Sequence, residues 1–181
     1  YDEVDFYNFN GTTWTFSQTV RATQIGAGFG SALAMDQDTA VIGSGFSNRY
    51  AWIYHHDGTS WAHQQLIDTI DGISVPEAIA SGILNLQGFG KAVDISGDRI
   101  AIGAPTGSVA NKGSAGAVFI YEYNGSAWTR EDLFTLPSVA AGDQFGAALA
   151  LDGDALVVSS PRRERTHGDD EGEAYAYRWK D

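Results

Sequence analysis

Pairs of acidic residues on short turns are the side chains of this sequence best suited to chemistry. Two carboxylates lie two residues apart at Asp36 and Asp38, and again at Asp152 and Asp154. Carboxylate oxygens bind calcium, but calcium takes about six to eight oxygens, more than one such turn supplies. We therefore expect no metal and no other cofactor. The alternative is calcium held by residues of these turns and of one acidic loop: Asp36, Asp38, Asp152, Asp154, Asp169, Asp170 and Glu171.

Two asparagines, Asn10 and Asn124, begin Asn-Gly-Thr and Asn-Gly-Ser sequons, which are acceptors for N-glycosylation in secreted proteins. Asn-Gly is also favoured in two-residue hairpin turns, because both residues readily adopt positive φ. The sequence therefore predicts type I′ hairpins at both sites. Both asparagines are candidate glycosylation sites if the protein is secreted by a eukaryote.

Three tryptophans at similar places in the chain could stack against sugars. Trp14, Trp61 and Trp128 each follow a tyrosine by seven residues. Aromatic side chains at such a regular spacing, on both sides of a turn, are typical of cross-strand packing. We interpret them as packing residues, with a lectin-like carbohydrate site as the alternative.

The charge and the missing residue types exclude several classes of function. Eleven basic and 23 acidic residues give a net charge of -12, which repels nucleic acid and anionic lipid. No apolar run approaches the roughly 20 residues that span a bilayer, so we expect no membrane insertion. The chain has no cysteine and therefore no thiol nucleophile. No catalytic motif is recognisable, and we expect the protein not to be an enzyme.

The elements that position these residues come from a sequence repeated three times. Its copies begin at Phe29-Gly30, Phe89-Gly90 and Phe145-Gly146. In each copy an aspartate follows the phenylalanine by nine residues, and a small residue that ends an apolar run follows it by fourteen. Short strands recurring at this period are typical of β-propeller blades.

Each complete copy is expected to form four antiparallel strands. We expect the third and fourth strands of a partial blade at residues 1–20, a blade at 21–67 and another blade at 87–136. Residues 68–86 are expected to form an inserted loop, in which Pro76 could begin a short helix. The last copy, residues 137–181, lacks its fourth strand.

Phe89-Gly90 followed by Gly103-Ala104-Pro105 resembles the FG-GAP repeat family, which includes integrin α-subunit-like propellers and secreted bacterial proteins. The resemblance implies an all-β propeller in which the phenylalanines fill the space between blades and the glycines allow close approach. Calcium-binding members of that family carry a longer Asp-rich loop, so the short turns here resemble a calcium-free bacterial variant. The residues that carry the repeat are Phe29, Gly30, Phe89, Gly90, Phe145, Gly146, Gly103 and Pro105.

Three blades are too few to close a ring, since propellers have about four to eight. We expect either an excerpt of a longer propeller or copies that complete one another's blades, as a two-chain ring or a filament. The resemblance implies a non-catalytic, extracellular or cell-surface module for binding or adhesion. Its partner would be another protein or a second copy. The alternatives are a carbohydrate-binding propeller and a fragment of a polysaccharide-acting propeller enzyme.

Overall fold

The computed structural model describes residues 2–23, 28–45, 50–68, 83–85, 87–163 and 171–180. Within these residues the regular elements are all β-strands, arranged in antiparallel sheets that do not close into a ring. The predicted fold, an all-β chain of incomplete propeller blades, is confirmed. The described residues contain no helical segment that could span a bilayer.

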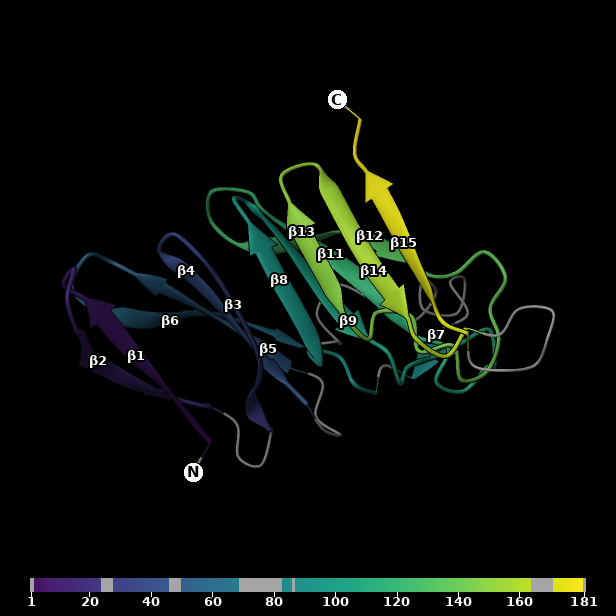
Figure 1. Ribbon diagram of the computed structural model, residues 1–181, viewed down its shortest axis with the longest axis horizontal. Helices are drawn as coiled ribbons and strands as arrows, with labels where there is room; N and C mark the ends of the chain where they lie inside the picture. The colour runs from purple at the N-terminus through teal and green to yellow at the C-terminus, as the bar shows by residue number, and fades with distance from the viewer. Residues whose placement is uncertain are drawn as a thin grey trace.

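The strands form an N-terminal hairpin followed by three blades (Figure 1). The N-terminal hairpin pairs β1 (Glu3–Phe9) with β2 (Trp14–Arg21). The first blade contains, in order, β3 (Phe29–Asp36), β4 (Thr39–Ser44), β5 (Tyr50–His56) and β6 (Trp61–Asp68). The second contains β8 (Ala92–Ser96), β9 (Arg99–Ala104), β11 (Ala117–Tyr123) and β12 (Trp128–Phe134). The third contains only β13 (Leu149–Asp152), β14 (Ala155–Ser160) and β15 (Glu173–Arg178).

The blades stack face to face, with the first strands β3, β8 and β13 side by side (Figure 1). Each blade has two faces. We call the face directed toward strands that come earlier in the chain its preceding face, and the opposite face its following face. Each junction encloses one apolar core, and Phe29, Phe89 and Phe145 each belong to a different one. The hydrophobic stabilisation of this fold therefore lies between blades.

The second strand of a blade is apolar on both faces because it lies between two neighbouring sheets. In β4 both Val41 and Ile42 are fully buried, and in β9 both Ala101 and Ile102 are. Val157 occupies the position of Val41 and Ala101 in the third blade, yet it is 46% exposed. No described blade covers the following face of the third blade.

The hairpin turns differ from the type I′ turns predicted at Asn10 and Asn124. A type I′ turn needs positive φ at both central residues, but only Gly11 and Gly125 have it, at 94° and 91°. Each asparagine instead accepts two backbone hydrogen bonds on its side-chain oxygen, from the residues two and three further on. The prediction of turns was right and their type was wrong, because the side chain itself closes the turn.

The insertion before the second blade contains a short strand. Strand β7 (Ile83–Asn85) pairs with β10 (Ser108–Val109), which lies in the connection between β9 and β11. An inserted loop was expected here, and pairing with β10 gives part of it a regular structure. The helix expected to begin at Pro76 lies outside the described residues.

Candidate functional site

The acidic residues considered for calcium include some that join neighbouring blades. Asp36 Oδ2 accepts a hydrogen bond of 2.7 Å from the backbone N–H of Gly97 in the next blade. Ser96 occupies the same repeat position, and its Oγ accepts from Gly153 N–H at 3.0 Å. Asp94 likewise accepts from Leu151 N–H at 2.7 Å. Carboxylate and hydroxyl oxygens on the following face therefore bind backbone amides across the junctions.

The other acidic candidates lie apart from one another. Asp38 Oδ1 lies 4.0 Å from His56 Nδ1, and Asp154 Oδ2 lies 3.5 Å from Arg178 Nε. Asp152 and Glu171 are exposed, whereas Asp169 and Asp170 fall outside the described residues. Over the described part of the chain, no three His, Cys, Asp or Glu side chains gather into a group that could hold a metal.

The two candidate glycosylation sites lie at the tips of hairpins. Asn10 and Asn124 are both exposed. In each, the oxygen of the side-chain amide is engaged by the turn, and Asn10 Nδ2 also donates to Thr13 Oγ1 at 3.2 Å. The positions are accessible to an attached sugar, and glycosylation stays a prediction.

Glutamine side chains connect the outer strands of successive blades, a feature that the sequence reasoning missed. Gln18 Nε2 donates to the Trp61 carbonyl and Gln18 Oε1 accepts from Trp61 N–H, both at 2.8 Å. Gln65 makes the same pair of bonds to Trp128, at 2.9 and 2.8 Å. The signal in the sequence is a glutamine four residues after the tryptophan in both copies. Asp132 stands at that position in the second blade.

The repeated glycines allow the blades to approach closely. A Cβ atom on Gly43 would collide with the carbonyl of Gly90, and one on Gly103 would collide with the carbonyl of Gly146. Pro105 follows directly after β9 and is buried. Ser159 takes the place of these glycines in the third blade. Its Oγ accepts a hydrogen bond from Ala148 N–H in its own blade.

The three tryptophans have very different environments. Trp128 is only 5% exposed and Trp61 stacks on Phe6 at 4.3 Å, but Trp14 is 70% exposed. The direct cross-strand neighbours of Trp14 and Trp128 are Phe9 and Tyr123. The aromatic packing was predicted, but the pairing with the tyrosine seven residues earlier was wrong. Because each turn contains four residues, the tyrosine lies two cross-strand pairs further from the turn than the tryptophan does.

Burial changes the acid–base behaviour of a few groups near the first junction. Burial raises the pKa of Tyr54, whose hydroxyl donates to the Arg21 carbonyl at 2.9 Å. Burial also lowers the pKa of His63, whose ring meets the Tyr54 ring edge-on at 5.5 Å. Both shifts favour the neutral form of the group in the folded protein, although His63 lies on an exposed part of β6.

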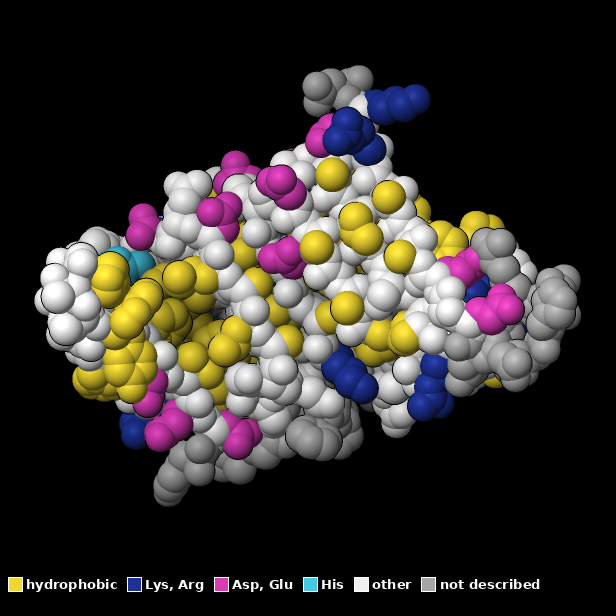
Figure 2. Space-filling model, viewed as in Figure 1, with side chains coloured by type: hydrophobic (Ala, Val, Ile, Leu, Met, Phe, Trp, Pro, Cys, Tyr) yellow, Lys and Arg dark blue, Asp and Glu magenta, His cyan; other side chains and the backbone are white. Residues whose placement is uncertain are grey.

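The preceding face of the first blade presents an open apolar surface. Leu33 and Met35 are 58% and 63% exposed, whereas Val93 and Ile95, at the same repeat positions, are 8% and 5% exposed. Figure 2 shows hydrophobic side chains gathered on the left of the view, over the region of β1 and the first blade. A groove runs there between β1 and the first blade, lined by Val4, Phe6, Leu33, Met35, Ala40 and Ile42, among others.

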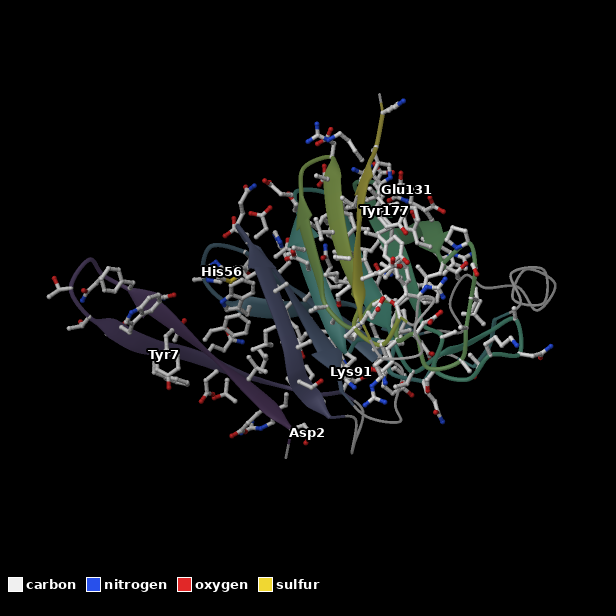
Figure 3. The ribbon with its side chains drawn as sticks, turned by 45° about the vertical axis from the view of Figure 1, so that its right-hand side comes forward. Asp2, Tyr7, His56, Lys91, Glu131 and Tyr177 are labelled. Atoms are coloured by element: carbon white, nitrogen blue, oxygen red, sulfur yellow. The ribbon has the colours of Figure 1, made fainter. Side chains whose placement is uncertain are left out.

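Exposed aromatic side chains extend this surface onto the N-terminal hairpin. Tyr7, Phe9, Trp14 and Phe16 are all more than half exposed. Figure 3 shows Tyr7 projecting from the hairpin away from the blades. Tyr54 and Tyr121, at the position of Tyr7 in the complete blades, are 3% and 4% exposed. Leu33, Met35 and Tyr7 are therefore exposed at positions whose equivalents in the second blade are buried.

Comparison with known proteins identifies the repeat. The family profile of the FG-GAP repeat matches residues 78–121 and 128–177, just over half of the chain. No curated protein matches. Among solved structures, the chain is similar to the crystal structure of the computationally designed Ika4 protein, with 10% sequence identity and a TM-score of 0.33. That similarity covers 87% of this chain and 95% of the designed one. The chain belongs to the FG-GAP repeat family.

Proposed function

We propose that this propeller-type module is a non-catalytic, extracellular or cell-surface protein that binds other proteins through its open blade faces. The observation that carries the proposal is the contrast in exposure between equivalent residues. Leu33 and Met35 are more than half exposed, while Val93 and Ile95 are buried in a junction. Exposed apolar patches on a protein surface are typical of sites for protein association.

The roles of the acidic side chains support a binding function over catalysis. Asp36 and Asp94 accept hydrogen bonds from the backbone of the next blade. Asp143 is buried and forms an ion pair with Arg163 at 2.8 Å. Asp36 and Asp94 connect neighbouring blades, whereas the Asp143–Arg163 pair connects two segments of the third repeat. The hydrogen-bonding capacity of all three carboxylates is directed at the protein itself.

An array of extracellular proteins, probed beside a glycan array, tests the proposal. We expect the labelled protein to bind protein spots, and the Trp14→Ser/Met35→Lys double variant to lose that binding. The matched control is Val157→Lys, which adds a charge to the open face at the other end. Protein binding that is unchanged in the double variant would contradict the proposal, as would turnover of a polysaccharide.

Light scattering tests whether the protein partner is a second copy of this chain. A mass that rises above 19.4 kDa with concentration would indicate self-association, and the double variant should then remain at 19.4 kDa. A compact 19.4 kDa particle at every concentration would contradict self-association and leave a different protein as the partner.

The second candidate function is carbohydrate binding at Trp14. This ring is 70% exposed, the highest value among the large hydrophobic side chains described. A flat exposed indole can stack on a sugar ring, as aromatic side chains do on other flat partners. Binding to glycan spots that is lost in Trp14→Ala and retained in Met35→Lys would favour this function over protein binding.

A further inference from the structure

We propose that the groove between β1 and β3 is the docking site for a two-stranded β-hairpin formed by the first and second strands of another FG-GAP repeat. The second strand of that hairpin would pair with the open edge of β1, and its first strand would cover Leu33 and Met35. This inference rests on the proposed function and names the partner of the same face.

The junction between the first and second blades shows which strands cover the surface equivalent to Leu33 and Met35. Val93 and Ile95 lie in one buried core with Val41 of β4, and Ala32 and Ala34 of β3 pack against that core. Strands β3 and β4 are the first and second strands of the preceding blade. The N-terminal hairpin, β1 and β2, corresponds to the third and fourth strands of a blade, because Tyr7 matches Tyr54 and Tyr121 in the repeat. Among the described residues, no first and second strand pair with this hairpin or cover Leu33 and Met35.

The edge of β1 that borders the groove is suited to accept a strand. Among the described residues, β1 is paired with β2 alone. Strands β5 and β11 pair with both the second and the fourth strand of their blades, and β15 pairs with the second strand. In those three sheets Tyr54, Tyr121 and Tyr177 lie opposite Ala40, Ile100 and Leu156, respectively. The same register would place the matching residue of the docking strand opposite Tyr7. Backbone pairing of this kind is a recurrent mode of peptide recognition.

The junctions also specify the side chains that the hairpin needs. Gly30 has φ of 89°, close to the 83° and 88° of Gly90 and Gly146. The carbonyls of those two glycines abut Gly43 and Gly103. The docking strand therefore needs a glycine opposite Gly30.

The first strand of the docking hairpin needs small side chains and one side chain that accepts a hydrogen bond. Ala32 and Ala34 supply the small side chains in the first blade. Asp36 and Ser96 accept from the backbone N–H groups of Gly97 and Gly153, the central residues of the next turns. Gln37 occupies the same turn position with φ of 50°, against 56° for Gly97. An Asp or Ser that ends the first docking strand would therefore reach the Gln37 N–H.

A second copy of this chain does not meet these requirements. The first two strands of its open third blade, β13 and β14, already carry β15 on the edge that β1 would occupy. Ser159 stands where the docking strand needs glycine, and it is held by Ala148 N–H at 2.9 Å. The structure favours a hairpin with the sequence features of β3 and β4 over the third blade of a second copy.

The experiment uses a peptide of residues 29–45 and the full chain labelled with ¹³C in its methionine methyl group. Met35 is the single methionine of the chain, so one NMR signal reports on the groove. We expect the unlabelled peptide to shift this signal and to slow hydrogen exchange of β1 amides by about tenfold or more. A Gly43→Val peptide and a Leu33→Lys protein should each abolish both effects. A Val157→Lys protein should retain them.

A tethered version covers the case in which the free peptide does not fold, because isolated hairpins are marginally stable in water. The same 17 residues are joined to Tyr1 through a two-residue linker, so that Gly45, the linker, Tyr1 and Asp2 reproduce the five residues between β4 and β5. Tethering raises the local concentration to about millimolar. We expect the Met35 shift and the protection of β1 in this protein, and neither in its Gly43→Val counterpart.

Three results would overturn the inference: no change in the tethered protein, equal effects from the Gly43→Val hairpin, or loss of binding in Val157→Lys. A Met35 signal that moves when the unmodified protein is concentrated would make a second copy the occupant and also overturn it. Hairpin binding with empty protein arrays would contradict the proposed function alone. Protein binding on the arrays without hairpin binding would contradict this inference alone.

Discussion

The junction between the first and second blades and the open side of the first blade are built from the same repeat, yet their environments are opposite. Ile95 is 5% exposed in the junction, and Met35, at the same position one repeat earlier, is 63% exposed. The difference lies in the neighbour, since β3 covers one residue and no described strand covers the other. Equivalent residues can therefore serve as matched pairs, one covered and one open.

The largest effect is expected for a large-to-small change inside the junction. Ile95→Ala should lower the free energy of unfolding by about 2–5 kcal/mol, because it removes buried methyl groups and leaves a cavity. Met35→Ala should change it by less than about 0.5 kcal/mol, as for other surface positions. Urea unfolding of the two variants measures the contrast. Equal losses would mean that the open side is covered in solution.

The glycine contact should give the next largest effect. Gly103→Ala places a Cβ against the Gly146 carbonyl, and overpacking of this kind costs about 1–3 kcal/mol. Ser159→Ala, the matched change in the third blade, removes only one hydrogen bond to Ala148, for about 1 kcal/mol or less. Thermal unfolding of both variants tests the order. A Gly103→Ala protein as stable as the wild type would show that the second and third blades can separate slightly at no cost.

The glutamine contact should give a smaller loss. Gln65→Ala removes two hydrogen bonds to the backbone of Trp128, which is 5% exposed, and we expect a loss of about 1–2 kcal/mol. Asp132→Ala, at the same position on the exposed outer strand of the second blade, should have an effect within about 0.5 kcal/mol. Unfolding in guanidinium measures both. A larger loss of stability in Asp132→Ala than in Gln65→Ala would contradict the prediction.

The smallest effect is expected from pH at the hairpin side of the first blade. Burial lowers the pKa of His63 below its ordinary value of 6.5, so the folded state favours the neutral ring. The stability that this neutral ring contributes is complete above pH 6.5 and is lost as the pH falls through the pKa of the folded state. Melting temperatures of the wild type and His63→Gln between pH 8 and 5 should diverge at the acidic end. Parallel curves would show that the His63 ring, which lies on an exposed part of β6, has the same pKa in the folded and unfolded protein.

Much of the fold could be predicted from the sequence because the repeat carries local information. The apolar runs in β4 and β9, the Asn-Gly and Asp-Gly turns and the spacing of the phenylalanines indicate short strands and tight turns without any knowledge of tertiary contacts. The type of turn could not be predicted. Whether Asn10 adopts positive φ or closes the turn with its side chain depends on small differences in backbone geometry.

The candidate site was less predictable, because exposure depends on neighbours distant in the sequence. Asp36 was considered for calcium, and the structure places it on the N–H of Gly97, sixty-one residues away. Gln18 and Gln65 contact tryptophans 43 and 63 residues later. No local pattern assigns such partners.

The repeat unit and the order of strands within a blade can be derived from the amino-acid sequence, because they follow from short-range periodicity. Which copies of an equivalent residue are buried can be seen only once the blades are packed together. Burial depends on which strands lie against a face, and no described strand covers Leu33 and Met35 as β3 and β4 cover the equivalent residues of the second blade.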